Sequence, residues 1–184
     1  ENGCIAIPLG KLLEITNVLP DTNISFIVSE IGKVNIECNS GYYTIMGQPH
    51  EEFPSEQSLE NSQELILLSN ELKDIITNTS YAASRDDLKP VLQGVLFQVK
   101  KDGIVSVATD GHRLVKFEKK DLHSLDYTGN IVVPIKFLSL LTPLLNEEGD
   151  VSLLIGDNHI QVNLEDIIIT TRIIKDPYPD YEGV

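Results

Sequence analysis

The residues that bring the most chemistry into a small space lie in the string VATDGHRLV at positions 107–115. Asp110, His112 and Arg113 follow one another there around an expected turn. A catalytic site would also need a second acid, base or nucleophile within hydrogen-bond reach and a cleft, and the sequence shows neither. The same residues could form a hairpin turn with solvated side chains, or a turn that lines a groove for a partner's peptide. All three interpretations stay open at this level.

Other candidates for chemistry are scattered along the sequence. His50, His123 and His159 have no carboxylate or histidine at ligand spacing, so we expect them on the solvated surface. Cys4 and Cys38 lie in strand-like surroundings, and we expect both to be small, buried, reduced side chains. The sequence contains no glycine-rich phosphate loop. We therefore expect no cofactor, no metal and no enzymatic activity.

Charge is unevenly distributed in the sequence. The chain holds 28 acidic and 14 basic residues, and a net charge of -14 on its own disfavours nucleic-acid binding. Five glutamates lie between positions 51 and 64, as in a solvated linker, whereas the segments VKKDG and EKKDL are locally basic. Lys11, Lys73 and Lys136 each stand near the start of an expected helix. Such lysines either serve solubility or line a groove that binds phosphates without reading bases.

The elements that must position these residues repeat along the chain. We predict a region 1–54, a linker 55–61 and a second region 62–184. The second region contains two copies of one unit, a strand, a helix and three strands, and we call each copy a round. The first round comprises strand 64–68, helix 69–83 and the strands GVLFQVK, GIVSVAT and HRLVKFE. The second round comprises strand 130–134, a helix to about Leu145 and the strands VSLLI, HIQVNL and DIIITTRII. Ser69 is expected to cap the first helix, Pro134 to lie in the first turn of the second, and Thr142-Pro143 to end it.

The N-terminal region is a further copy of this round. Pro8 in CIAIPLGKLLEITNVLP falls opposite Pro134 in NIVVPIKFLSLLTPLL at an offset of 126, and Phe53 falls opposite Tyr178 at an offset of 125. A near-constant offset indicates a duplicated unit. Asp102-Gly103, Asp110-Gly111 and Gly156-Asp157-Asn158 predict tight antiparallel hairpins. The expected fold class is therefore α+β, with antiparallel sheets and helices on one face.

Two of these strings also carry a family resemblance. VATDGHRLV (107–115) and RIIKDPYPDYEGV (172–184), with GNIVVPIKFLSLL between them, resemble the middle domain of the bacterial DNA polymerase III beta subunit, the beta sliding clamp. Residues 1 to about 54 are similar to the second half of the clamp's first domain, and residues 62–184 to its second domain. The resemblance implies the DNA clamp fold, in which head-to-tail rings of two protomers carry sheets outside and helices inside. An acidic outer surface can then coexist with a modestly basic channel.

The resemblance also implies function and partners. It implies a non-catalytic processivity factor that encircles duplex DNA without reading its sequence and tethers the replicative DNA polymerase. The clamp loader and repair proteins with clamp-binding motifs are expected as further partners, with a homodimer in the intact protein. No apolar run approaches the roughly 20 residues that cross a bilayer, and we expect a cytoplasmic protein without membrane contact.

Site residues carry over position by position. The implied partner-peptide groove comprises Leu92, Thr109, Gly111, His112, Arg113, Leu114, Pro179 and Val184, with Gly183 standing where some members have an arginine. The implied DNA-binding residues are Lys73, Arg85, Lys89 and Lys136. The implied protomer interface comprises Lys11, Ile15, Leu19, Tyr43 and Ile45, for which core packing is the alternative. At the level of the whole protein, the alternative is a repeat-built protein-interaction domain without a nucleic-acid role.

Overall fold

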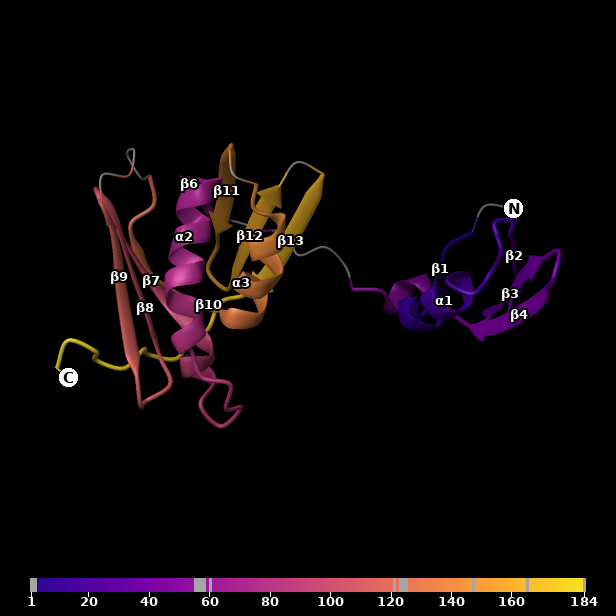
Figure 1. Cartoon of the computed structure of the whole chain (residues 1–184), viewed down its shortest axis with the longest axis horizontal. Coiled ribbons are helices and arrows are strands. Elements are labelled where there is room, and N and C mark those ends of the chain that lie inside the picture. Colours follow the sequence, from indigo (N-terminus) through magenta and orange to yellow (C-terminus); the bar gives the residue numbers. More distant parts are fainter. Residues whose placement is uncertain are drawn as a thin grey trace. The chain divides into compact units, whose positions relative to one another are not determined.

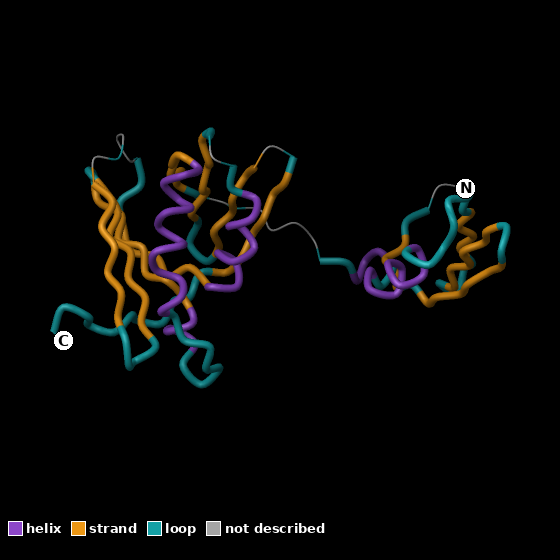
Figure 2. Tube along the Cα trace, viewed as in Figure 1, coloured by secondary structure: helices purple, strands orange, loops and turns teal. Residues whose placement is uncertain are grey.

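The computed structural model describes residues 3–54, 59, 61–120, 122, 126–146, 148–164 and 166–183. The chain divides into two compact units, Glu1–Glu56 and Gln57–Val184 (Figures 1 and 2). The linker expected at 55–61 lies mostly outside the described residues. Within the described ranges, no helix has the length and apolar character needed to cross a bilayer.

The larger unit contains two rounds of strand, helix and three strands. The first round consists of β6 (Gln63–Leu68), α2 (Ser69–Thr79), β7 (Gly94–Lys100), β8 (Gly103–Thr109) and β9 (Leu114–Lys120), with the 3-10 turns η2 (Ser80–Ala82) and η3 (Pro90–Gln93) between α2 and β7. The second consists of β10 (Gly129–Pro134), α3 (Ile135–Leu141), the 3-10 turn η4 (Thr142–Leu144), β11 (Asp150–Ile155), β12 (His159–Leu164) and β13 (Ile167–Arg172). This order confirms the α+β prediction.

The two rounds exchange their first strands. One sheet has the order β10-β7-β8-β9 and the other the order β13-β12-β11-β6, and all neighbours are antiparallel. Strand β6 of the first round pairs with β11 of the second, from Gln63↔Ile155 to Leu68↔Asp150. Strand β10 of the second round pairs with β7 of the first. Each first strand therefore completes the sheet of the other round, and neither round closes its sheet alone.

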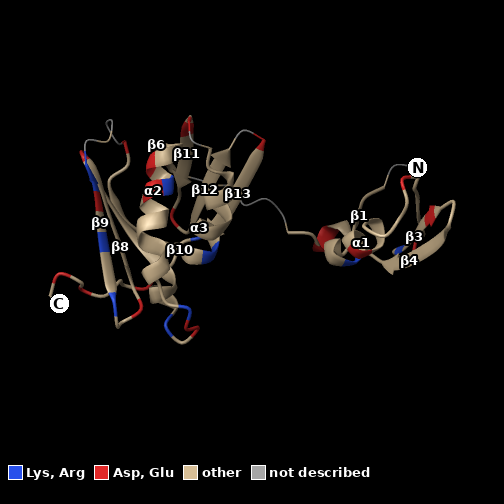
Figure 3. Cartoon of the chain, viewed as in Figure 1, with Lys and Arg blue, Asp and Glu red and all other residues tan. Residues whose placement is uncertain are grey.

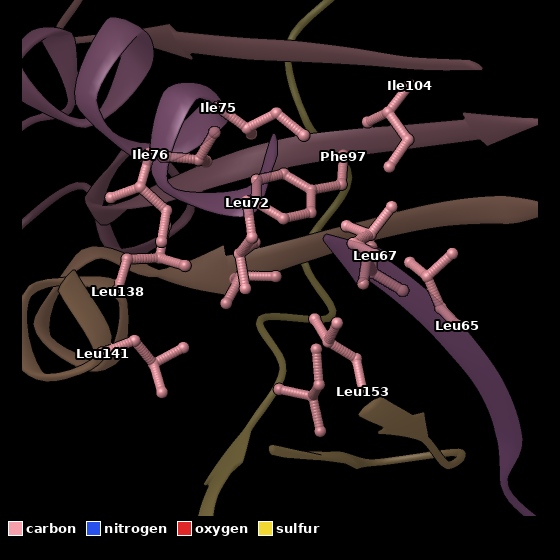
Figure 4. Packing of buried hydrophobic residues seen from close by; sticks show 14 of the residues in the cluster. Leu65, Leu67, Leu72, Ile75, Ile76, Phe97, Ile104, Leu138, Leu141 and Leu153 are labelled. Atoms are coloured by element: carbon pink, nitrogen blue, oxygen red, sulfur yellow. The ribbon is translucent and has the colours of Figure 1, made fainter. Parts of the chain in front are cut away.

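A single apolar core joins the two rounds. Helix α2 buries Leu72, Ile75 and Ile76 at helical spacing, and these side chains point toward Phe97 and Leu138 from other elements (Figure 4). All five are at most 2% exposed. Burial of one face of each helix against the sheets is the main stabilising term for such short elements.

The helix ends differ in part from the expectation. Residue Leu68, and not Ser69, occupies the cap of α2, where the Glu71 carboxylate accepts the Leu68 N–H at 3.0 Å. The Ser69 hydroxyl instead donates to the Asn146 carbonyl at 2.6 Å, so the predicted Ser69 cap is wrong. Helix α2 ends at Thr79 and α3 at Leu141, before the residues expected. Thr142-Pro143 does stop the second helix, because the chain turns into η4 there.

The smaller unit repeats the same order. It contains β1 (Ile5–Ala6), α1 (Leu9–Thr16), β2 (Ser25–Val28), β3 (Lys33–Cys38), β4 (Gly41–Met46), β5 (Gln48–Pro49) and the 3-10 turn η1 (His50–Glu52). The sheet has the order β2-β3-β4, and β1 pairs with β5. Cys4 is exposed and Cys38 half-buried, so the expectation of buried cysteines is wrong.

Candidate functional site

The turn between β8 and β9 is held by its own polar side chains. The last pair of the ladder is Thr109↔Leu114, which leaves residues 110–113 as the connection. The Thr109 hydroxyl donates to the Arg113 carbonyl at 2.7 Å and accepts the Gly111 N–H at 3.0 Å. Asp110 Oδ1 accepts the main-chain N–H groups of His112 at 2.9 Å and Arg113 at 3.0 Å. These contacts fix the main chain of the turn.

The Arg113 side chain is tied to two different elements. Its Nε lies 3.1 Å from Asp110 Oδ2, and its Nη2 donates to the Tyr81 carbonyl in η2 at 2.9 Å. The N–H groups of His112 and Arg113, together with the Arg113 guanidinium, hold the pKa of Asp110 below its usual range. The guanidinium is thus placed by both the turn and the end of the helical segment.

The catalytic interpretation of the turn gains no support from this geometry. Asp110 bonds to the main chain of His112 and to Arg113, whereas the His112 residue is exposed. General acid–base chemistry would require the carboxylate or the imidazole to face a reacting group. Among the described residues, no group of three His, Cys, Asp or Glu side chains is gathered to hold a metal.

The loop 84–93 lies beside this turn. The Ser84 N–H donates to the Leu92 carbonyl at 2.8 Å, which closes the loop, and Leu92 is 8% exposed. A Cβ on Gly111 would lie 3.7 Å from Lys89 Nζ. Leu114, at the start of β9, remains 39% exposed. The structure therefore brings the loop and the turn of the expected groove close together.

The C-terminal segment adds a third border to this region. After β13 the segment crosses the sheet β10-β7-β8-β9, in the direction of β8 and β9 (Figure 1). The Tyr178 hydroxyl donates to the Val107 carbonyl at 3.3 Å, and the Tyr181 hydroxyl donates to Gln98 Oε1 at 2.5 Å. A cavity of about 560 Å³ lies along this segment. Pro179 is exposed next to the anchored Tyr178, and Val184 lies outside the described residues.

Sequence reasoning missed three contributors to this region. Tyr81 contributes only a main-chain carbonyl, which no residue type signals. Tyr178 and Tyr181 could have been found, because two aromatic residues in a polar segment often mark packing against a surface.

The expected DNA-binding residues have different surroundings. Lys73 is half-buried, and its ammonium donates to the Leu145 carbonyl at 3.5 Å. Arg85, Lys89 and Lys136 are exposed. Arg85 and Lys136 line one groove of about 830 Å³ that also contains apolar side chains, and Figure 3 shows basic residues in the loop below α2.

The expected protomer-interface residues are also divided. Ile45 is 6% exposed in the core of the smaller unit, and Ile15 packs against that core. Lys11 is exposed, Leu19 half-buried and Tyr43 37% exposed. Core packing thus accounts for Ile15 and Ile45, while Lys11, Leu19 and Tyr43 are at least partly exposed to solvent.

The fold and the site define a repeat-built α+β protein with an organised polar cluster in a surface turn. A family model described as DNA polymerase III beta subunit, central domain, matches residues 66–180, which include this turn. The chain belongs to the DNA polymerase III beta subunit family.

Individual relatives agree with this assignment. The beta sliding clamp of Buchnera aphidicola subsp. Rhopalosiphum padi is 31% identical over 186 residues, covering 99% of this chain and 50% of the relative. The DNA polymerase III subunit beta of Pseudomonas aeruginosa has a crystal structure with a TM-score of 0.83 and 30% identity, covering 100% of this chain and 51% of that one. A Bartonella birtlesii sliding clamp bound to griselimycin has a TM-score of 0.85 and 26% identity, with 100% and 51% coverage. The chain spans about half the length of these relatives.

Proposed function

We propose that the chain is part of a DNA sliding clamp, a non-catalytic processivity factor that encircles duplex DNA in the cytoplasm. The clamp would tether the replicative polymerase, the clamp loader and repair proteins through a peptide groove. The observation that carries this proposal is the family match over residues 66–180, which contain the Arg113 turn and most of the C-terminal segment beside it. The groove assignment is supported by the nearness of the loop 84–93 to the turn, since Lys89 Nζ of that loop would lie 3.7 Å from a Cβ on Gly111. Leu114, which directly follows the turn, is 39% exposed.

The DNA-facing surface would need only modest charge. Arg85, Lys89 and Lys136 are exposed and can attract phosphates, whereas Lys73 is partly committed to the Leu145 carbonyl. A ring stays on DNA through its topology, so a few non-specific phosphate contacts suffice despite the net charge of -14.

The smaller unit is proposed to be the second half of a first clamp domain. At the offset of 126, Val34 and Ile36 of β3 correspond to Ile160 and Val162 of β12. Their partners in the neighbouring strands are therefore equivalent too, so that Phe26 and Val28 of β2 correspond to Leu153 and Ile155 of β11. Phe26 and Val28 are each 50% exposed, whereas Leu153 is 1% and Ile155 5% exposed, because α2 and β6 of the other round help to cover them. A preceding round, contributed by further sequence such as the longer relatives contain, would cover β2 in the same way.

A homodimeric ring is proposed through the exposed part of the same unit. Lys11, Leu19 and Tyr43 would meet the next protomer, while Ile15 and Ile45 support them from the core. In the sliding clamps that the sequence resembles, a third domain forms the other half of the groove, and residues 1–184 match only the first two domains. We therefore expect this chain alone to bind partner peptides poorly.

The tethering role is tested with a fluorescent peptide from the clamp-binding tail of the replicative polymerase and the full-length protein containing these residues. Leu114→Ala should weaken binding by about 1–2 kcal/mol, since it removes an apolar groove contact. Ile168→Ala is the control, because Ile168 is an apolar side chain that is 66% exposed on β13, in the sheet that does not contain β8 and β9. Equal affinities for wild type and Leu114→Ala would remove the groove assignment.

A further inference from the structure

We propose that Asp110 is a positioning residue for the peptide groove, which holds the Arg113 guanidinium in one orientation toward an oxygen acceptor of the bound partner. This inference rests on the proposed function and deepens it. Asp110 itself would touch no partner atom and would act through Arg113.

Two contacts at different nitrogen atoms fix the plane of the guanidinium. Asp110 Oδ2 holds Nε at 3.1 Å, and the Tyr81 carbonyl accepts from Nη2 at 2.9 Å. A planar group held at two of its donors cannot rotate freely, and its other N–H groups remain available. The Arg113 side chain is still 60% exposed, so those N–H groups are accessible to a ligand.

The partner chemistry follows from the donors that remain. An arginine held in place donates best to a carboxylate or carbonyl oxygen, because both present lone pairs in the plane of the guanidinium. Leu114 follows Arg113 directly and is 39% exposed. The fitting ligand is therefore a peptide that places an oxygen acceptor next to an apolar side chain.

The two oxygen atoms of Asp110 have separable tasks. Oδ1 accepts the N–H groups of His112 and Arg113 and shapes the turn, whereas Oδ2 faces the guanidinium. In Asp110→Asn, the amide oxygen can keep the first task, while an NH₂ group replaces the oxygen that faced Nε. The substitution thus removes the hold on Arg113 and preserves the turn.

The experiment is a double-mutant cycle in the full-length protein with the same fluorescent polymerase-tail peptide. Asp110→Asn should weaken binding about two- to fivefold, as expected for loss of an exposed ion pair that orders a binding group. In an Arg113→Ala background the same change should have less than about a 1.5-fold effect, because its target is gone. A merely structural role would weaken binding equally in both backgrounds, and that result would overturn the proposal.

A second variant keeps the test independent of how Asp110→Asn folds. Arg113→Lys retains the charge but cannot be held at two nitrogens, so it should lose about as much affinity as Arg113→Ala. Wild-type affinity of Arg113→Lys, or of Asp110→Asn, would contradict a role in orientation. Failure of the wild-type protein to bind the peptide at all would instead overturn the proposed function, and this inference with it.

Discussion

Gly111 is the residue whose backbone conformation the turn most depends on. Its φ of +92° lies in a region that residues with a Cβ rarely adopt, although no atom closer than Lys89 Nζ at 3.7 Å would contact an added Cβ. The cost of a substitution therefore comes from backbone strain and not from a clash. Gly111→Ala should lower the stability of the unit 57–184 by about 1–2 kcal/mol.

Urea denaturation followed by circular dichroism measures this effect. Gly111→Asn is the control at the same position, because asparagine tolerates positive φ better than alanine does and should cost less. An alanine variant as stable as the wild type, or less damaging than the asparagine variant, would contradict the strain argument.

Tyr178 provides a residue-scale prediction about pH. Burial raises the pKa of Tyr178 to about 12. An unfolded tyrosine has a pKa of about 10, so the folded protein binds this proton more tightly. The stability that Tyr178 contributes is therefore complete below about pH 10 and lost as the pH rises toward 12.

Tyr178→Phe should consequently flatten the fall in stability over this alkaline range, as measured by urea midpoints at a series of pH values. Tyr81→Phe is the control, since Tyr81 is 59% exposed and its main-chain carbonyl is unchanged. Parallel pH profiles for wild type and Tyr178→Phe would show that the Tyr178 proton is not linked to folding.

At the scale of elements, the exchange of β6 and β10 makes the two rounds one cooperative unit. Leu72→Ala in the first round and Leu138→Ala in the second should each cost about 2–5 kcal/mol, because both side chains are at most 1% exposed in the shared core. Hydrogen exchange should show amides of β7 and β11 losing protection together in either variant. Loss of β7 protection with β11 unaffected would contradict cooperativity, and Leu140→Ala should leave both unchanged.

Sequence patterns predicted most of these elements but not how they combine. The Asp-Gly turns and alternating apolar residues were enough to predict β7, β8 and β12 at their observed bounds, because such signals are local. The exchange of first strands depends on pairings between distant residues, such as Gln63↔Ile155, which no local pattern encodes. Ser69 was misassigned for the same reason, since its hydroxyl partner Asn146 is remote in sequence.

The candidate site shows the same division. The residues of the turn 110–113 were expected together, because they are contiguous and polar around a glycine. The role of the Tyr81 carbonyl and the anchoring of the C-terminal segment by Tyr178 and Tyr181 required coordinates. The burial of Ile45 likewise depends on how β4 faces its own helix, which spacing alone left open.

At the scale of the whole molecule, the proposed ring would keep an acidic chain on DNA through its topology. The duplicated domain 62–184, the half-exposed apolar face of β2 and the exposed Arg85, Lys89 and Lys136 each fit a ring built from further copies of the same unit. Such a ring would hold DNA without strong phosphate binding, so its retention should depend on the shape of the DNA and little on salt.

The most direct test loads the full-length protein onto nicked circular DNA with the clamp loader and washes at high salt. We predict that the protein stays on the circle and leaves within minutes once a restriction enzyme linearises it, since a ring can slide off an end. Equal retention on circular and linear DNA, or loss from both at high salt, would contradict encirclement.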